Sequence, residues 1–114
     1  MIADTMYAKY KKERDGDQLL ETDWGFIFYG LNGKECYIAE MFVDESARSI
    51  GNGKQLVGML GDIARAHGCE FLSGNIYVKK PGGSNAALAA QLAGFEILSA
   101  HNDVLTIIKK LEGA

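Results

Sequence analysis

The sequence predicts an α/β fold, namely a mixed, mostly antiparallel sheet with a central parallel strand pair and flanking helices. A helical segment at Lys54 to His67 lies between two strand-like segments, an order typical of a crossover that joins parallel neighbours. The Asn32-Gly33 pair indicates a hairpin before this unit. Turn-like residues at 100–103 separate the last two strand-like segments and favour a second antiparallel pair after it.

Length and composition favour one globular domain over residues 1–114. A chain of this length buries enough surface for one hydrophobic core. Its 47% apolar and 24% charged residues are close to the average of globular proteins and exclude a disordered chain. The 12 basic and 15 acidic residues give a net charge of −3, and the basic ones occur in scattered pairs. Nucleic acid is therefore disfavoured as the main partner.

The expected location of the protein follows from its apolar runs and its cysteines. No apolar run approaches the roughly 18 residues that a membrane span needs, and the first residues do not resemble a signal peptide. Cys36 and Cys69 are too few and too far apart in sequence to indicate a disulfide framework or a zinc site. We therefore expect a cytoplasmic protein with reduced thiols, no metal and no membrane partner.

The first half of the chain is predicted to form one helix and three strands. Residues 3–14 are rich in helix formers, and the Asp-Gly-Asp run at 15–17 ends them. A short strand is expected over Gln18 to Thr22. The segments Trp24 to Tyr29 and Glu35 to Val43 are β-rich and mostly apolar, so we expect a hairpin that is covered on much of both faces.

The second half begins with an amphipathic helix. Its apolar residues recur at i, i+3, i+4, i+7 and i+8, which places on one face Leu56, Met59, Leu60, Ile63 and Ala64. Gly68 is a natural helix stop, and Cys69 to Val78 is the strand that completes the crossover. The remaining predicted elements are a helix and two strands, at Ala86 to Ala93, Phe95 to Leu98 and Val104 to Leu111.

Glycine is in surplus, with 14 residues where an average content near 7% predicts about 8. Two of them, in Gly51-Asn52-Gly53, stand where a strand and a short polar loop give way to the amphipathic helix. Amides at a helix N-terminus have no intrahelical partner and carry a partial positive charge. Because glycine has no Cβ, a phosphate can approach them closely, and the segment predicts an anion site.

Two common phosphate-binding patterns do not fit this segment. A P-loop has glycine, four residues and then Gly-Lys-Ser/Thr, but Arg48 stands at the first position and Gln55 at the last. The dinucleotide-binding pattern Gly-x-Gly-x-x-Gly fits at Gly51 and Gly53 and fails at Leu56.

A third pattern fits at every position. The run Arg48-Ser49-Ile50-Gly51-Asn52-Gly53 resembles Gln/Arg-x-x-Gly-x-Gly/Ala, the pyrophosphate loop of the GNAT N-acetyltransferase superfamily. As in the family, an apolar strand ending in Val43 and four connecting residues precede the loop, and an amphipathic helix and a strand follow it. Gly94-Phe95 is similar to the Gly-Phe after the family's next helix. The likeness extends over residues 24–111 and is that of a small, N-terminally shortened member with a GNAT-like fold.

The resemblance implies acetyl-CoA as co-substrate, lying between two parallel strands that splay apart, here Tyr37 to Val43 and Phe71 to Val78. It implies that the pantetheine arm pairs with the backbone of Met41, Phe42 and Val43. It also implies that loop amides hold the pyrophosphate, through Ser49, Ile50, Gly51, Asn52, Gly53 and Lys54. The implied activity is direct transfer of an acetyl group to an amine of a small molecule or a peptide, with backbone amides polarising the thioester carbonyl.

Three further side chains have roles that the sequence leaves open. Arg48 either meets a phosphate or pairs with a nearby acidic residue, Asp44 or Glu45. Asn85 either contacts the coenzyme or caps the following helix. Glu40 is the candidate catalytic base, because an acidic residue at or next to this position is common in polyamine-type and aminoglycoside-type members. The alternative is that strand alternation points Glu40 to water, where it pairs with a lysine.

The chain departs from the family at two places. Many members have a tyrosine four residues before Gly-Phe that protonates the leaving thiolate, and here that residue is Ala90. The residues before Trp24 are too few for the family's usual first strand and two helices, so the acceptor site is reduced, open or completed by a second chain in a homodimer. An alternative function is therefore a GNAT-fold protein that binds coenzyme A or another partner without transferase activity.

Overall fold

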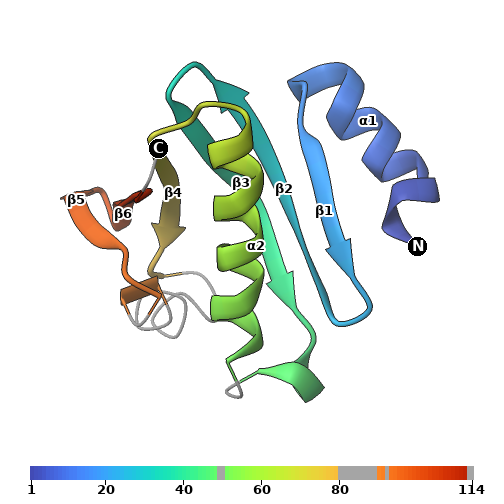
Figure 1. The fold of residues 1–114 in the computed structure, drawn as a ribbon. Coiled ribbons are helices and arrows are strands. Elements are labelled where there is room, and N and C mark those ends of the chain that lie inside the picture. The colour runs from blue at the N-terminus through green and yellow to red at the C-terminus, as the bar shows by residue number, and fades with distance from the viewer. Residues whose placement is uncertain (49–50, 80–89, 92, 113–114) are drawn as a thin grey trace.

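The computed structural model describes residues 1–48, 51–79, 90–91 and 93–112 as a six-stranded sheet with helices beside it (Figure 1). In chain order the elements are η1 (Ile2–Asp4), α1 (Met6–Asp15), β1 (Gln18–Thr22), β2 (Gly25–Asn32), β3 (Glu35–Val43), η2 (Glu45–Ala47), α2 (Asn52–Ala66), β4 (Phe71–Tyr77), β5 (Glu96–His101) and β6 (Val104–Lys110). The strand order is β1-β2-β3-β4-β6-β5, and every pair is antiparallel except β3 and β4. The predicted mixed sheet with a central parallel pair is therefore confirmed.

Two tight hairpins have the backbone geometry that their sequences favour. Asn32 pairs with Glu35, so the loop is Gly33-Lys34, one residue later than a loop centred on Asn-Gly. Gly33 has a φ of +62°, which suits the first central position of a type II′ turn. In the β5–β6 hairpin, Asn102 and Asp103 both have positive φ, of 51° and 63°, as a type I′ turn requires.

Several element boundaries differ from those that the sequence predicts. The N-terminal helix begins at Met6 because Thr5 caps it, with its hydroxyl accepting a 3.2 Å hydrogen bond from the Ala8 amide. β5 continues to His101, since its ladder with β6 extends to the turn. Of the predicted helix over 86–93, the structure describes Ala90 and Gln91 as helical and Ala93 as the turn that follows; the other residues of that prediction lie outside the described part.

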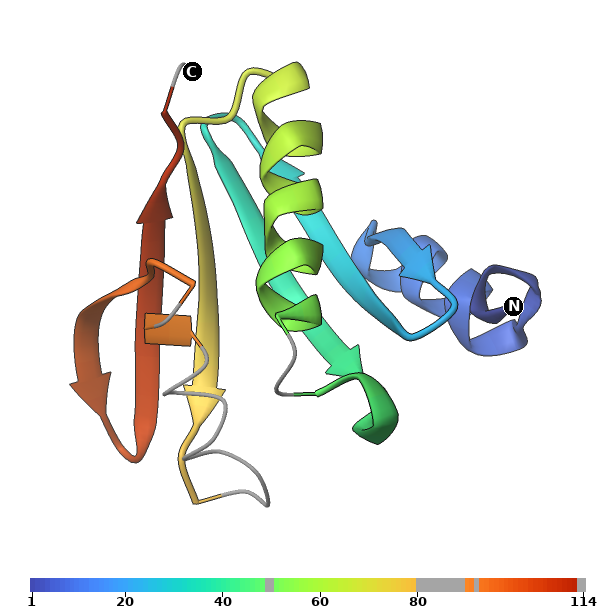
Figure 2. The same cartoon turned by 60° about the horizontal axis from the view of Figure 1, so that its bottom comes forward.

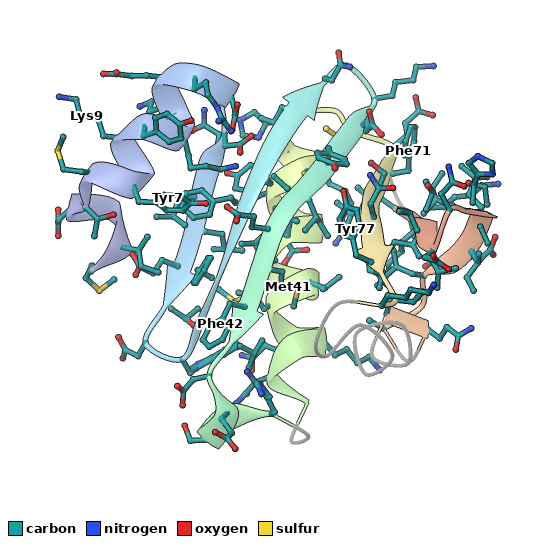
Figure 3. The ribbon with its side chains drawn as sticks, turned by 180° about the vertical axis from the view of Figure 1, so that it is seen from behind. Tyr7, Lys9, Met41, Phe42, Phe71 and Tyr77 are labelled. Carbon is teal, nitrogen blue, oxygen red and sulfur yellow. The ribbon has the colours of Figure 1, made fainter. Side chains whose placement is uncertain are left out.

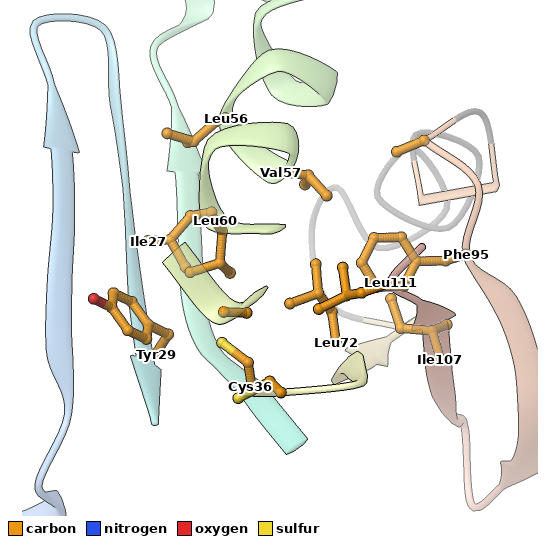
Figure 4. Close-up of a cluster of buried hydrophobic side chains, with 13 residues drawn as sticks. Ile27, Tyr29, Cys36, Leu56, Val57, Leu60, Leu72, Phe95, Ile107 and Leu111 are labelled. Atoms are coloured by element: carbon orange, nitrogen blue, oxygen red, sulfur yellow. The ribbon is translucent and has the colours of Figure 1, made fainter. Parts of the chain in front are cut away.

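The core lies between α2 and the sheet (Figure 4). Leu56, Leu60 and Ala64 are completely buried, as the helical spacing predicts. Val57 and Gly61 are also buried, whereas Met59 and Ile63 are only partly so. A Cβ at Gly61 would lie 3.4 Å from a Leu111 methyl group. The buried face is therefore rotated slightly toward the C-terminal residues, which local periodicity cannot reveal.

Cys36 and Cys69 are free thiols inside this core. Burial, together with the neighbouring Cys69 and Glu35, raises the pKa of the Cys36 thiol to about 12. Burial also raises the pKa of Cys69. Both side chains thus pack as small apolar groups.

Candidate functional site

The two parallel strands pair over only part of their length. Glu35 to Ile38 pair with Phe71 to Gly74, and the ladder then stops. β3 nevertheless continues to Val43, still paired with β2 on its other edge, while β4 continues to Tyr77, still paired with β6. Figure 2 shows the two strands diverging. We call this region, residues 39–43 of β3 and 75–77 of β4, the splay. Here the β4-facing backbone edge of β3 can accept an extended ligand as an added strand.

A β-bulge at Ala39 decides which way the β3 side chains point. Phe28 of β2 is opposite Glu40, whereas the next residue, Tyr29, is opposite Ile38, so Ala39 is an extra residue. A single extra residue reverses the alternation of side chains between the two faces of a strand.

The bulge therefore separates β3 into two sets of side chains. Before it, Cys36 and Ile38 face α2 and belong to the core. After it, Met41 and Val43 face α2, since a Cβ at Gly53 would lie 3.9 Å from each of them. The opposite face carries Tyr37, Glu40 and Phe42. Figure 3 looks onto this face, which we call the open face.

The N-terminus of α2 has the features of an anion site. Gly51 is the N-cap, with φ +86° and ψ 0°, and no side chain caps the helix. The Gly51 carbonyl accepts the first helical hydrogen bond, 2.9 Å from the Gln55 amide. A Cβ at Gly51 would meet no atom within 4 Å, so the surrounding space is open. The first-turn amides of Asn52, Gly53 and Lys54 thus have no side-chain cap. The predicted contact residues Ser49, Ile50 and Asn85 lie outside the described residues.

Arg48 is anchored to the end of β3. Its Nε donates a 2.9 Å hydrogen bond to the Val43 carbonyl, and its guanidinium carbon lies 5.5 Å from the centre of the Phe42 ring. Asp44 instead accepts a 3.1 Å bond from the Ser46 amide, and the bonds from Ser46 lower the pKa of the Asp44 carboxyl. Among the described residues, no ion pair within 4 Å joins Arg48 to an acid.

The predicted base, Glu40, lies on the open face beside α1. Its side chain is 44% exposed. The Tyr7 hydroxyl donates a 2.6 Å hydrogen bond to Glu40 Oε2, and the Lys11 ammonium lies 3.5 Å from the same oxygen. This bond to Glu40 is also the main reason why the pKa of Tyr7 is raised. Glu40 Oε1 has no hydrogen-bond partner in the described part of the chain.

Lys11 is the centre of a buried ionic cluster. Its side chain is only 9% exposed, and its Nζ lies 3.1 Å from Asp15 Oδ2 and 3.0 Å from Asp17 Oδ2. The ammonium also lies 5.8 Å from the centre of the Phe28 ring. Burial opposes the charged form, yet the bonds to Asp17 and Asp15 raise the pKa of Lys11 above its usual value. The i, i+4 spacing of Lys11 and Asp15 predicts their ion pair from the sequence. No local pattern predicts that Lys11 also contacts Asp17 and Glu40.

A short chain of hydrogen bonds crosses the open face from β3 to β6. Asn75 Nδ2 donates to the Tyr37 hydroxyl over 3.3 Å, and the Thr106 hydroxyl donates to Asn75 Oδ1 over 3.0 Å. Local sequence does not indicate the bond between Tyr37 and Asn75, because these partners are 38 residues apart. Ala90, at the place of the family's tyrosine, is half-buried and packs against the core.

The described residues contain no group of three or more His, Cys, Asp or Glu side chains placed to hold a metal ion. Within the same part of the chain, no helix is both long and apolar enough to cross a membrane.

Comparison with known proteins gives a family and a fold. The sequence model of the Acetyltransferase (GNAT) family matches residues 7–95. No curated protein sequence matches the chain significantly.

Three solved structures illustrate the likeness in fold. Nourseothricin acetyltransferase is 21% identical, with a TM-score of 0.65 over 76% of this chain and 57% of its own. The PaiA N-acetyltransferase of Thermoplasma acidophilum, solved with coenzyme A, is 15% identical, with a TM-score of 0.71 over 89% of this chain and 65% of its own. The ribosomal-protein-S18-alanine N-acetyltransferase of Escherichia coli is 14% identical, with a TM-score of 0.67 over 96% of this chain and 79% of its own. The chain thus spans less than two thirds of the length of the first two proteins.

Proposed function

The chain belongs to the GNAT acetyltransferase family, and from this premise we propose that it transfers the acetyl group of acetyl-CoA directly to an amine. Membership of this family supports acetyl transfer from an acyl-CoA donor in general. One observation carries the proposal for this chain: the β3–β4 ladder ends after Ile38 and Gly74, and β3 then leads to the uncapped, glycine-initiated N-terminus of α2. A free strand edge beside an anion site suits a ligand with an extended arm and a pyrophosphate.

In this proposal the coenzyme follows β3 toward α2. The pantetheine arm pairs with the backbone of Met41 to Val43, on the edge that the splay leaves open. The pyrophosphate is held by the first-turn amides of α2, from Gly51 to Lys54, with Ser49 and Ile50 as expected partners. Arg48 and Asn85 remain candidate contacts to the coenzyme. The positive φ and open surroundings of Gly51 support this arrangement, because a side chain would extend into the space left for the phosphates.

Glu40 is the proposed base. It takes a proton from the substrate ammonium, and the freed amine nitrogen attacks the thioester carbon. The carbon–sulfur bond then breaks to release the coenzyme thiolate, and the nitrogen loses its second proton to solvent as the amide forms. The geometry supports this role in one respect: Tyr7 and Lys11 both contact Oε2, so Oε1 is left free on the open face. Tyr7 and Lys11 would thereby hold the carboxylate in one orientation.

The experiment that tests this function has two stages. Calorimetric titration of the protein with acetyl-CoA is expected to show saturable binding at one site. A thiol-release assay with spermidine, lysine, kanamycin and an alanine-terminated peptide then identifies the acceptor class. Absence of binding at millimolar acetyl-CoA would contradict the coenzyme site itself.

Glu40→Gln is expected to reduce kcat about 100-fold, the usual scale for losing a general base. The affinity for acetyl-CoA should stay within twofold of wild type, since the proposed pantetheine contacts are made by the backbone of residues 41–43, which the substitution does not change. Glu70→Gln is the matched control, because Glu70 is also half-exposed and lies 3.2 Å from a lysine, Lys34. Full activity of Glu40→Gln would remove Glu40 as the base and leave its carboxylate as a partner of Tyr7 and Lys11.

Coenzyme binding without transfer is the second candidate function. The observation that favours it is Ala90, which presents only a methyl group where many family members have a tyrosine hydroxyl. Saturable acetyl-CoA binding together with no thiol release from any of the four amines would support this alternative.

A further inference from the structure

Transfer to an amine needs a proton for the departing thiolate, and Ala90 cannot supply it. We propose that Tyr37 is the catalytic acid that donates this proton. The inference rests on the proposed acetyl transfer and adds a residue to the same site. Four observations support it. Tyr37 lies next to the start of the splay, its hydroxyl makes a defined hydrogen bond, and its side chain lies on the same face as Glu40. The fourth is that the other exposed tyrosines are bonded elsewhere or lack a bond that orients them.

Tyr37 lies where the two parallel strands begin to separate. It pairs with Ser73, the next pair is Ile38 with Gly74, and the ladder ends there. Its hydrogen-bond partner, Asn75, is the first β4 residue beyond the ladder. The 3.3 Å bond between the Tyr37 hydroxyl and Asn75 Nδ2 therefore crosses from β3 to β4 at the closed end of the splay. In the proposed binding mode the thioester lies between these two strands, next to this bond.

The hydrogen bonds around Tyr37 leave its hydroxyl available as a donor. Thr106 is directly opposite Asn75 in the β4–β6 ladder, and its hydroxyl donates to Asn75 Oδ1. This bond occupies the amide oxygen and leaves the amide NH₂ to face Tyr37. Because an NH₂ group only donates, the Tyr37 oxygen is the acceptor, and its own hydrogen is free for another partner.

The bulge at Ala39 brings Tyr37 and Glu40 to the same face of the sheet. Residues three apart on a regular strand point to opposite faces. The extra residue reverses the alternation between them, so both side chains lie on the open face, away from the core. An acid and a base from one strand can thus act on one reaction, with the acid at the closed end of the splay and the base further along β3.

The other exposed tyrosines are less suited. The Tyr7 hydroxyl already donates to Glu40, on the β2 side of β3. The Tyr10 hydroxyl pairs with Arg14 on α1. Tyr77 is 53% exposed and, within the described part of the chain, has no side-chain hydrogen bond to orient it. Tyr37 combines 37% exposure with a fixed hydroxyl.

The proton transfers balance as follows. The ammonium proton goes to Glu40, the amine nitrogen bonds to the acetyl carbon, and the carbon–sulfur bond breaks. The sulfur receives the Tyr37 hydroxyl proton, so coenzyme A leaves as the thiol. The nitrogen loses its second proton to solvent as the amide forms, Glu40 releases its proton to solvent, and the Tyr37 phenolate takes one proton back before the next turnover.

The test is Tyr37→Phe, which removes only the hydroxyl. The assay uses saturating acetyl-CoA and whichever of spermidine, lysine, kanamycin and the alanine-terminated peptide is the best acceptor. We expect kcat to fall about 100-fold, as for loss of a general acid, while the acetyl-CoA Kd stays within twofold. Tyr10→Phe is the control, because the Tyr10 hydroxyl pairs with Arg14 on α1, outside the splay, and its kcat should stay within twofold of wild type.

The possible outcomes separate this inference from the proposed function. If wild type transfers acetyl groups and Tyr37→Phe keeps its kcat, Tyr37 is not the acid, and the proposed function is unaffected. If Tyr37→Phe loses acetyl-CoA affinity, or if Tyr10→Phe is equally slow, the assignment is also wrong. If wild type binds acetyl-CoA and acetylates none of the four amines, both the transfer and the assignment are overturned.

Discussion

Gly51→Glu is expected to abolish measurable acetyl-CoA binding while the protein stays folded. The space around the Gly51 Cα is open, so a glutamate side chain fits but extends into the region left for the pyrophosphate. Its charge also opposes the phosphates at the uncapped amides of α2. We expect Kd to rise at least 100-fold, which corresponds to about 2.7 kcal/mol. Calorimetry measures this affinity, and circular dichroism reports on the fold.

The matched control is Gly68→Glu, at the opposite end of the same helix. Gly68 has a φ of +81°, close to the +86° of Gly51, and a Cβ there would also meet no atom within 4 Å. Both substitutions thus carry a similar left-handed backbone strain of about 1–2 kcal/mol. Gly68→Glu should lower stability similarly and keep the acetyl-CoA affinity. Equal affinity in the two variants would contradict the assignment of the glycine loop to the pyrophosphate.

Lys11→Met is expected to lower the free energy of unfolding by about 3–5 kcal/mol, the usual cost of breaking a buried ion pair on one side. Asp17 is itself 8% exposed, and among the described residues only the Lys11 ammonium, at 3.0 Å, compensates its Oδ2. Methionine keeps most of the packing against Phe28, so the loss reports on the charge. Urea denaturation measures it.

The control for this prediction is an exposed ion pair. Lys34 lies 3.2 Å from Glu70 with its side chain 75% exposed, and Lys34→Met should cost less than about 1 kcal/mol. A second variant, Lys11→Met with Asp17→Leu, should recover much of the stability, because no buried charge is left unpaired. If Lys11→Met costs as little as Lys34→Met, the buried pair of Lys11 and Asp17 does not stabilise the fold as proposed.

The pH dependence of stability provides a second test of the Lys11 cluster. The pKa of Lys11 is raised in the folded state above its usual value of 10.5. Its contribution is therefore fully present below pH 10.5 and is lost as the pH rises through the folded-state pKa. Wild type should lose stability over this alkaline range, and Lys11→Met should lose less.

Local patterns in the sequence were sufficient for much of the fold. The strand limits Gln18–Thr22 and Glu35–Val43 are the same in the prediction and in the structure. The crossover and the parallel pair follow from the strand–helix–strand order, and Gly51 opens α2 as the loop pattern predicts. These features depend on residues that are neighbours in the chain, through turn geometry, side-chain periodicity and helix termination.

The tertiary structure alone decided how the open face is composed. Strand alternation cannot reveal the bulge at Ala39, since a bulge depends on how β3 pairs with β2, and this one residue brings Tyr37 and Glu40 to one face. The bond from Tyr37 to Asn75 and the contact of Lys11 with Glu40 join residues from distant segments. The sequence by itself therefore determined the family, the fold and the glycine at which α2 begins. Only the folded chain determined which side chains meet on the open face, because strand pairing and burial are set by long-range contacts.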